Sequence, residues 1–79
     1  MGKTIIVQCK AHRSRLSSVT VQELYGALLH HGADEAWLIT TAGFQRSATS
    51  FAANKRLRLL TIRQVLEGNE LWETPACGR

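Results

Sequence analysis

The fold of this chain is organised around its first strand-like stretch, Ile5-Ile6-Val7-Gln8-Cys9-Lys10. Three consecutive branched aliphatic residues predict a strand that is buried on both faces, as in a sheet covered by helices. Because side chains alternate along a strand, Gln8 and Lys10 share one face and Cys9 lies on the other. An amide and an amine at the end of a buried strand indicate either a polar site or a strand end that simply reaches solvent.

The composition is that of one small globular domain with a basic balance. The chain has 79 residues, of which 44% are hydrophobic, so a folded core is expected. Ten Lys and Arg residues against six Asp and Glu residues give a net charge of +4. This charge favours a polyanionic partner, nucleic acid before membrane, because no basic amphipathic helix with an aromatic face is present. The sequence also lacks a signal peptide and a membrane-spanning apolar run, so we expect a cytoplasmic protein without membrane contact.

Two helices carry recognisable end signals. In the first, Thr20 has capping-box spacing to Glu23, and Gly32 fits the C′ position at the other end. Thr61 and Gln64 have the same capping spacing at the start of a short last helix. The first helix should therefore join two strands, and the last should follow the final strand.

The remaining patterns complete a regular alternation of strands and helices. Residues 36–41 and 56–61 have strand patterns, and residues 44–53 have a helical pattern between them. Residues 74–79 are interpreted as a flexible tail. The resulting order, strand-helix-strand-helix-strand-helix, predicts an α/β fold with a three-stranded, mainly parallel sheet. If the strands lie in the order 1-2-3 across the sheet, right-handed crossovers place both crossover helices on the same face.

The alternation within each strand also predicts what each face carries. Leu57 and Leu59 are expected beneath the helices, together with Cys9 as a small core residue rather than a nucleophile. The opposite, uncovered face is expected to carry Ile6, Gln8, Lys10, Leu38, Thr40, Arg56 and Arg58. In this interpretation the uncovered face is basic, and its arginines either form a solvated surface or contact phosphates.

Three segments in this order resemble a known family. They are Val7-Gln8-Cys9-Lys10, Val21-Gln22-Glu23-Leu24-Tyr25-Gly26-Ala27, and Leu38-Ile39-Thr40-Thr41-Ala42-Gly43-Phe44 followed by Ala48. Together they resemble the Mrr-type restriction endonuclease domain, a branch of the PD-(D/E)XK nuclease superfamily whose last motif is often Gln-x-Lys. The similarity covers roughly residues 4–68. It implies a restriction endonuclease-like half-domain, DNA as partner, and metal-dependent hydrolysis of phosphodiester bonds.

The resemblance also implies roles for matching residues. Lys10 would activate the attacking water and stabilise developing charge, Gln8 would take the acidic or amide position of the motif, and the Cys9 backbone carbonyl would be a metal ligand. Glu23 is either a further metal ligand or the capping-box residue. The implied cofactor is Mg²⁺, but the family's metal-binding aspartate has no counterpart here. We therefore interpret residues 1–73 as the C-terminal half of such a domain, with weak or absent Mg²⁺ binding and impaired hydrolysis.

Two surfaces follow as candidate interfaces. The residues expected to contact phosphates are Lys10, His12, Arg13, Arg15, Arg56 and Arg58. The first strand should occupy a sheet edge and pair with a second copy, giving a homodimer with Ile6 and Leu38 exposed beside it and Leu71 and Trp72 covering part of the open face. The alternatives to a nuclease domain are a non-catalytic nucleic-acid-binding module and an oligomeric assembly module of the same fold.

Overall fold

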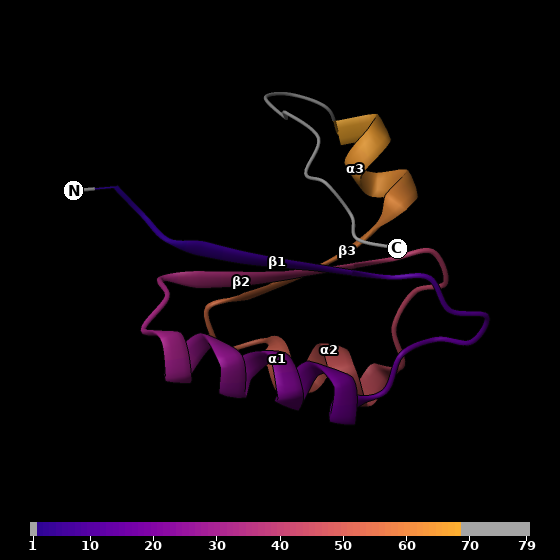
Figure 1. Ribbon diagram of the computed structural model, residues 1–79. Coiled ribbons are helices and arrows are strands. Elements are labelled where there is room, and N and C mark those ends of the chain that lie inside the picture. The colour runs from indigo at the N-terminus through magenta and orange to yellow at the C-terminus, as the bar shows by residue number, and fades with distance from the viewer. Residues whose placement is uncertain (1, 69–79) are drawn as a thin grey trace.

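Strands and helices alternate along the whole described chain. The computed structural model describes residues 2–68. Its elements are β1 (Ile5–Lys10), α1 (Ser18–His31), β2 (Glu35–Thr40), α2 (Arg46–Ala52), β3 (Leu57–Thr61) and α3 (Ile62–Gly68). The strands form one parallel sheet in the order β1-β2-β3, and α1 and α2 lie side by side beneath it (Figure 1). The predicted α/β fold, its element order and its helices mostly on one face are confirmed.

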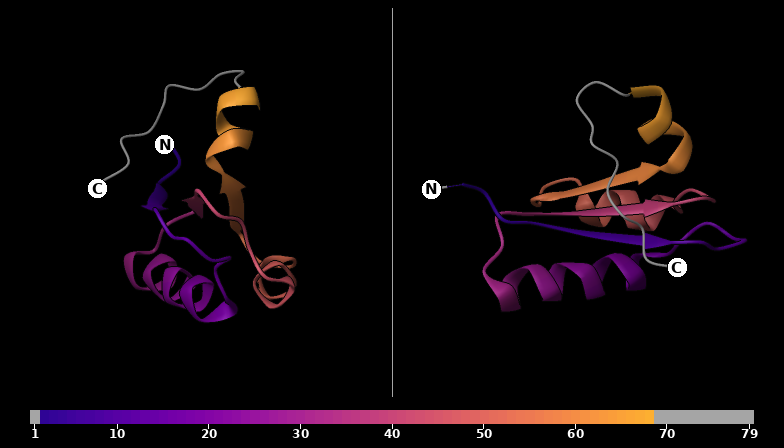
Figure 2. Two further views of the ribbon diagram at one scale, coloured as in Figure 1. Left: turned by 90° about the vertical axis from the view of Figure 1, so that its right-hand side faces the viewer. Right: turned by 45° about the horizontal axis from the view of Figure 1, so that its top comes forward.

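The third helix leaves the sheet on the other side. α3 follows β3 directly and rises from the face opposite α1 and α2 (Figure 2, left). It begins with the predicted capping box: the Gln64 N–H donates to Thr61 Oγ1 at 3.1 Å, and Gln64 Oε1 accepts the Thr61 N–H at 2.8 Å. The predicted tail, together with Leu71 and Trp72, lies outside the described residues. Within the described part of the chain, no helix is both long and apolar enough to cross a membrane.

α1 begins earlier than the sequence predicted. Its N-cap is Ser17, whose Oγ accepts the Val19 N–H at 3.3 Å. The Thr20–Glu23 capping box was wrong, because Thr20 already lies within the helix. Ser17, Ser18 and Thr20 all carry hydroxyl groups that can act as N-caps, and the helix begins after the first of them. The other end was correct: Gly32 ends the helix with a φ of 64°, in the left-handed region.

The core lies between the sheet and the two crossover helices. Its largest fully buried side chains include Leu24 and Leu28 of α1 and Leu38 of β2. Burying each of them stabilises the fold by roughly 1.5–3 kcal/mol. Ala36 and Ala48 are also fully buried and belong to the same hydrophobic cluster. The buried residues of α1 are Val21, Leu24 and Leu28, whose helical spacing puts them on one face of the helix.

The strand register overturns the predicted assignment of the two sheet faces. The residues that align across the strands are Ile6, Ala36 and Leu57, then Gln8, Leu38 and Leu59, then Lys10, Thr40 and Thr61. Because aligned residues of parallel strands point to the same face, Gln8 and Lys10 share the helix-covered face with Leu57 and Leu59. The prediction that they lie opposite these leucines was wrong. Three aliphatic residues in a row do not show which side of the strand faces the core. The sequence therefore could not tell which residues of β1 share a face with Leu57 and Leu59.

The open face is correspondingly different from the expected one. It carries Ile5, Val7, Cys9, Glu35, Trp37, Ile39, Arg58 and Leu60. Cys9 thus lies on the open face and not beneath the helices, which corrects the prediction. Ile5 and Val7 are 38% and 36% exposed, so β1 is not buried on both faces. The predicted exposure of Ile6 and Leu38 was also wrong, because Leu38 is fully buried and Ile6 packs against the core.

Candidate nucleic-acid interface

The carboxyl ends of the three parallel strands meet at one edge of the sheet. This carboxyl edge comprises the strand-terminal residues Lys10, Thr40 and Thr61 together with residues 11–17 and 41–45, which follow β1 and β2. Both crossover helices run back from it, so their N-termini also lie there (Figure 1). Open parallel sheets bind ligands at this edge, and helix N-termini favour anions.

Backbone hydrogen bonds tie the two loops of the carboxyl edge together. The Leu16 N–H donates to the Gly43 carbonyl at 2.9 Å, and the Gln45 N–H donates to the Leu16 carbonyl at 2.8 Å. Thr41 Oγ1 accepts the His12 N–H and donates to the His12 carbonyl, both at 3.2 Å. Gly43 has a φ of 111°, a conformation that residues with a Cβ rarely adopt. The loop after β1 is therefore held against a turn that requires glycine.

Basic side chains lie on the two loops of this edge and beside them. Lys10 is half-buried at the end of β1, whereas His12, Arg13 and Arg15 are exposed in the loop that follows. Arg15 lies along the turn, since a Cβ added at Gly43 would stand 3.9 Å from its Cγ. Arg46, also exposed, is the first residue of α2. None of these side chains forms an ion pair with a carboxylate within residues 2–68. The edge is therefore an uncompensated positive surface.

A comparison with protein-family models identifies the kind of domain. The model Mrr_cat, described as a restriction endonuclease, matches residues 1–68. The chain belongs to this family. No curated protein and no solved structure matches it. The family match agrees with the resemblance carried by the Gln-x-Lys segment and the turn before Phe44, whereas the interpretation as the C-terminal half of a longer domain stays a prediction.

The phosphate contacts predicted for this Mrr_cat domain divide between separate surfaces. Lys10, His12, Arg13 and Arg15 come together at the carboxyl edge, but Arg56 and Arg58 do not join them. Arg58 lies on the open face with its guanidinium carbon 5.5 Å from the centre of the Trp37 ring. Arg56 precedes β3, at the opposite end of the strand from the carboxyl edge. The basic face that Arg56 and Arg58 were predicted to share with Lys10 is therefore not formed.

Arg46 is a member of this surface that the sequence interpretation did not include. Only its position could have indicated it, directly after the turn that follows β2. Loops after strands of a parallel sheet come together at one edge, so a cation there joins those after β1. The isolated bridge between Leu16 and Phe44 brings this about in the structure.

The residues that the resemblance assigns to a metal do not form a metal site among themselves. Gln8 and Lys10 share a face as predicted, but the Cys9 carbonyl points in the plane of the sheet towards its free edge, because the adjacent even-numbered residues bond to β2. Glu23 is exposed and stands about 200° around α1 from the buried Val21, away from the sheet. An amide and a backbone carbonyl carry no net charge and are weak ligands for Mg²⁺.

The other carboxylates within residues 2–68 do not supply the missing charge. Asp34 and Glu35 lie at the amino end of β2, where Asp34 Oδ2 accepts the Thr4 N–H at 2.7 Å. Within the described residues there is no group of three His, Cys, Asp or Glu side chains that could hold a metal ion. These residues therefore do not fit a Mg²⁺ centre, and no chemical step through Mg²⁺ follows from their arrangement.

Proposed function

We propose that this Mrr_cat domain binds the phosphate backbone of DNA at its carboxyl edge. The observation that carries the proposal is that Lys10, Arg13, Arg15 and Arg46 lie on, or directly next to, two loops that backbone hydrogen bonds hold together. Arginine, lysine and helix N-termini are the usual donors to DNA phosphates. No described carboxylate lies on the two loops or at the strand ends of this edge.

Within this edge, we assign Lys10 to the phosphate that the family would cleave. Lys10 is half-buried beside the fully buried Thr40, so its ammonium is more restrained than the exposed arginines of the loop. Gln8 lies one row further along the same face. Lys10 would stabilise negative charge on the phosphate, and Gln8 would orient it. Because the surrounding carboxylates of a metal centre are absent from the described residues, the chain alone should bind DNA without cutting it efficiently.

Fluorescence anisotropy with a labelled DNA duplex at low ionic strength tests the binding proposal. Lys10→Ala and Arg15→Ala should each weaken binding severalfold, whereas Lys3→Ala removes the same charge near the amino ends of the strands and should change it little. Equal effects of all three variants would show that only net charge matters. Absence of binding at low salt would refute DNA binding and leave the assembly module as the remaining function.

We also propose that the domain forms a homodimer through β1. β1 is an edge strand, and the backbone groups of Ile5 and Val7 point away from β2 because Glu35 N–H bonds to the Thr4 carbonyl. Both side chains are exposed, so among the described residues this edge strand presents an accessible apolar stretch. A two-fold axis at Val7 would pair the two β1 strands antiparallel and join both sheets into one.

Light scattering after size exclusion tests this dimer. The wild-type chain should show about twice its 8.8 kDa mass at micromolar concentration. Val7→Lys should return it to the monomer, whereas Leu29→Lys, which replaces a 55% exposed leucine on α1, should not. If the wild-type chain is a monomer, or if the dimer persists in Val7→Lys, β1 is not the dimer interface.

A further inference from the structure

The outer side of β3 presents a second row of unused backbone groups. The Ala36 N–H donates to the Arg56 carbonyl at 3.1 Å, so even-numbered residues of this strand bond to β2. The backbone N–H and C=O groups of Leu57 and Leu59 therefore point outwards. Thr61 N–H points the same way but is taken by Gln64 Oε1. No described residue bonds to Leu57 or Leu59 on this side, so the free edge is short and well defined.

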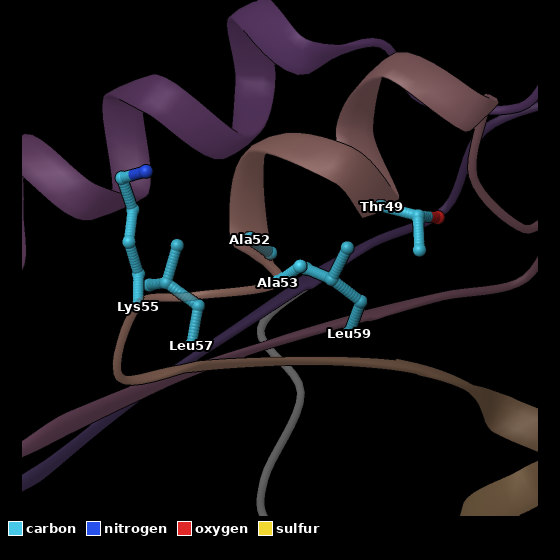
Figure 3. A pocket seen from close by; sticks show the side chains of 6 residues that line it. All are labelled: Thr49, Ala52, Ala53, Lys55, Leu57 and Leu59. Atoms are coloured by element: carbon cyan, nitrogen blue, oxygen red, sulfur yellow. The ribbon is translucent and has the colours of Figure 1, made fainter.

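An apolar pocket lies directly beside this free edge. Leu57 and Leu59 form its floor, and the rest of its lining comes from Thr49, Ala52, Ala53 and Lys55 (Figure 3). Its volume is about 280 Å³, and it is open to solvent. Sites for drug-sized ligands occupy roughly 300–1,000 Å³ and enclose most of the ligand. The pocket suits instead an aliphatic side chain from a strand laid along β3.

The charges around this edge define what such a strand should carry. Arg56 and Arg58 are exposed on either side of Leu57, and Lys55 stands at one end of the pocket. Lys55 Nζ already donates to the Phe51 carbonyl at 2.9 Å and lies 4.0 Å from the centre of the Phe51 ring, so it is held in place. A second copy pairing β3 with β3 would bring both sets of arginines together, at a like-charge cost. An acidic strand would complement them.

We propose that the β3 edge binds an extended acidic segment of a partner protein by strand addition. The added strand bonds to the free groups of Leu57 and Leu59. Because side chains alternate along it, one set enters the pocket beneath α2 and the other lies beside Arg58 on the open face. The partner is therefore a segment with alternating aliphatic and acidic residues. This surface is separate from the carboxyl edge and from β1, so the proposal stands independently of DNA binding and of dimerisation.

A fluorescein-labelled peptide of alternating leucine and glutamate, long enough to cover β3, is the probe. We expect saturable binding to the full chain by anisotropy. Ala53→Leu fills the pocket from an exposed position and should weaken binding at least about tenfold. Leu59→Pro removes an outward N–H without touching the ladder to β2 and should do the same. Val7→Pro is the matched control, since it removes an outward N–H from the other edge strand and should leave peptide binding unchanged. Circular dichroism verifies that each variant is folded.

Several outcomes would overturn the proposal. One is that the peptide does not bind to the wild-type chain. Another is that Val7→Pro weakens peptide binding as much as Leu59→Pro does. Tight binding of a peptide with lysine in place of glutamate would show that the edge does not select acidic residues. Displacement of the peptide by duplex DNA would assign the edge to nucleic acid. Loss of a concentration-dependent oligomer in Ala53→Leu would show that a second copy fills the pocket.

Discussion

The sharpest test of the carboxyl edge is the salt dependence of DNA binding. Each phosphate neutralised by Lys or Arg releases condensed counterions, so the logarithm of the binding constant falls with the logarithm of the salt concentration, with a slope of about −0.9 per contact. If Lys10, Arg13, Arg15 and Arg46 each contact one phosphate, the slope is about −3.6. Between about 50 and 200 mM salt, affinity should then fall roughly 150-fold.

A pair of double variants separates the edge from the overall charge. Arg13→Ala with Arg15→Ala should reduce the slope to about −1.8, so that the same change in salt costs only roughly 12-fold in affinity. Arg56→Ala with Arg58→Ala removes the same charge from elsewhere on the domain and should leave the slope unchanged.

The assay is fluorescence anisotropy of one labelled duplex, titrated at four or more salt concentrations chosen to span about 50–200 mM. Equal slopes for the two double variants would refute a localised phosphate site at the carboxyl edge. A slope near zero in the wild type would refute phosphate contacts altogether.

The other predictions concern chemistry and stability. Supercoiled plasmid incubated with the isolated chain and Mg²⁺ or Mn²⁺ should show no robust nicking on agarose gels, and nicking that disappears in Lys10→Ala would contradict this. Gly43→Val should destabilise the fold by about 1–3 kcal/mol in urea unfolding, because its φ of 111° is strained for a residue with a Cβ. Leu38→Ala should cost about 2–5 kcal/mol in the same assay, since the side chain is fully buried between sheet and helices; a loss below about 1 kcal/mol would show that the core there is loosely packed.

Local signals were sufficient for the order of elements and for the sheet. Gly32 ended α1 where its permissive backbone predicted, and Thr61 with Gln64 capped α3 as their spacing predicted. The parallel sheet followed because strands joined by helices run in the same direction. These features depend on neighbouring residues, which the sequence displays directly.

The relation between strands could not be read in the same way. Which residues of β1 and β3 point to the same face depends on packing with α1 and α2. The segment Ile5-Ile6-Val7 presents apolar residues to both faces, so it does not settle the choice. Shifting the alignment of a strand by one residue moves each of its side chains to the other face of the sheet. This single choice placed Lys10 with Arg58, whereas the register places the sheet between them. Arg46 was missed for a related reason, because only the bridge between Leu16 and Phe44 brings the segments that carry Arg15 and Arg46 to the same edge.

The corrected faces also constrain how a nuclease site could be completed. Lys10 lies at the carboxyl edge on the helix-covered side, so a phosphate must reach it along that edge and not across the open face, where Trp37 and Arg58 lie. Carboxylates for a metal would have to arrive beside β1, the strand that carries Gln8 and Lys10. The outer side of β1 can pair with only one strand, so a segment that brings these carboxylates would displace the second copy of the proposed dimer. We therefore expect self-association and Mg²⁺-dependent cleavage to be mutually exclusive: a complementing chain that restores cleavage while the β1 dimer persists would contradict this arrangement.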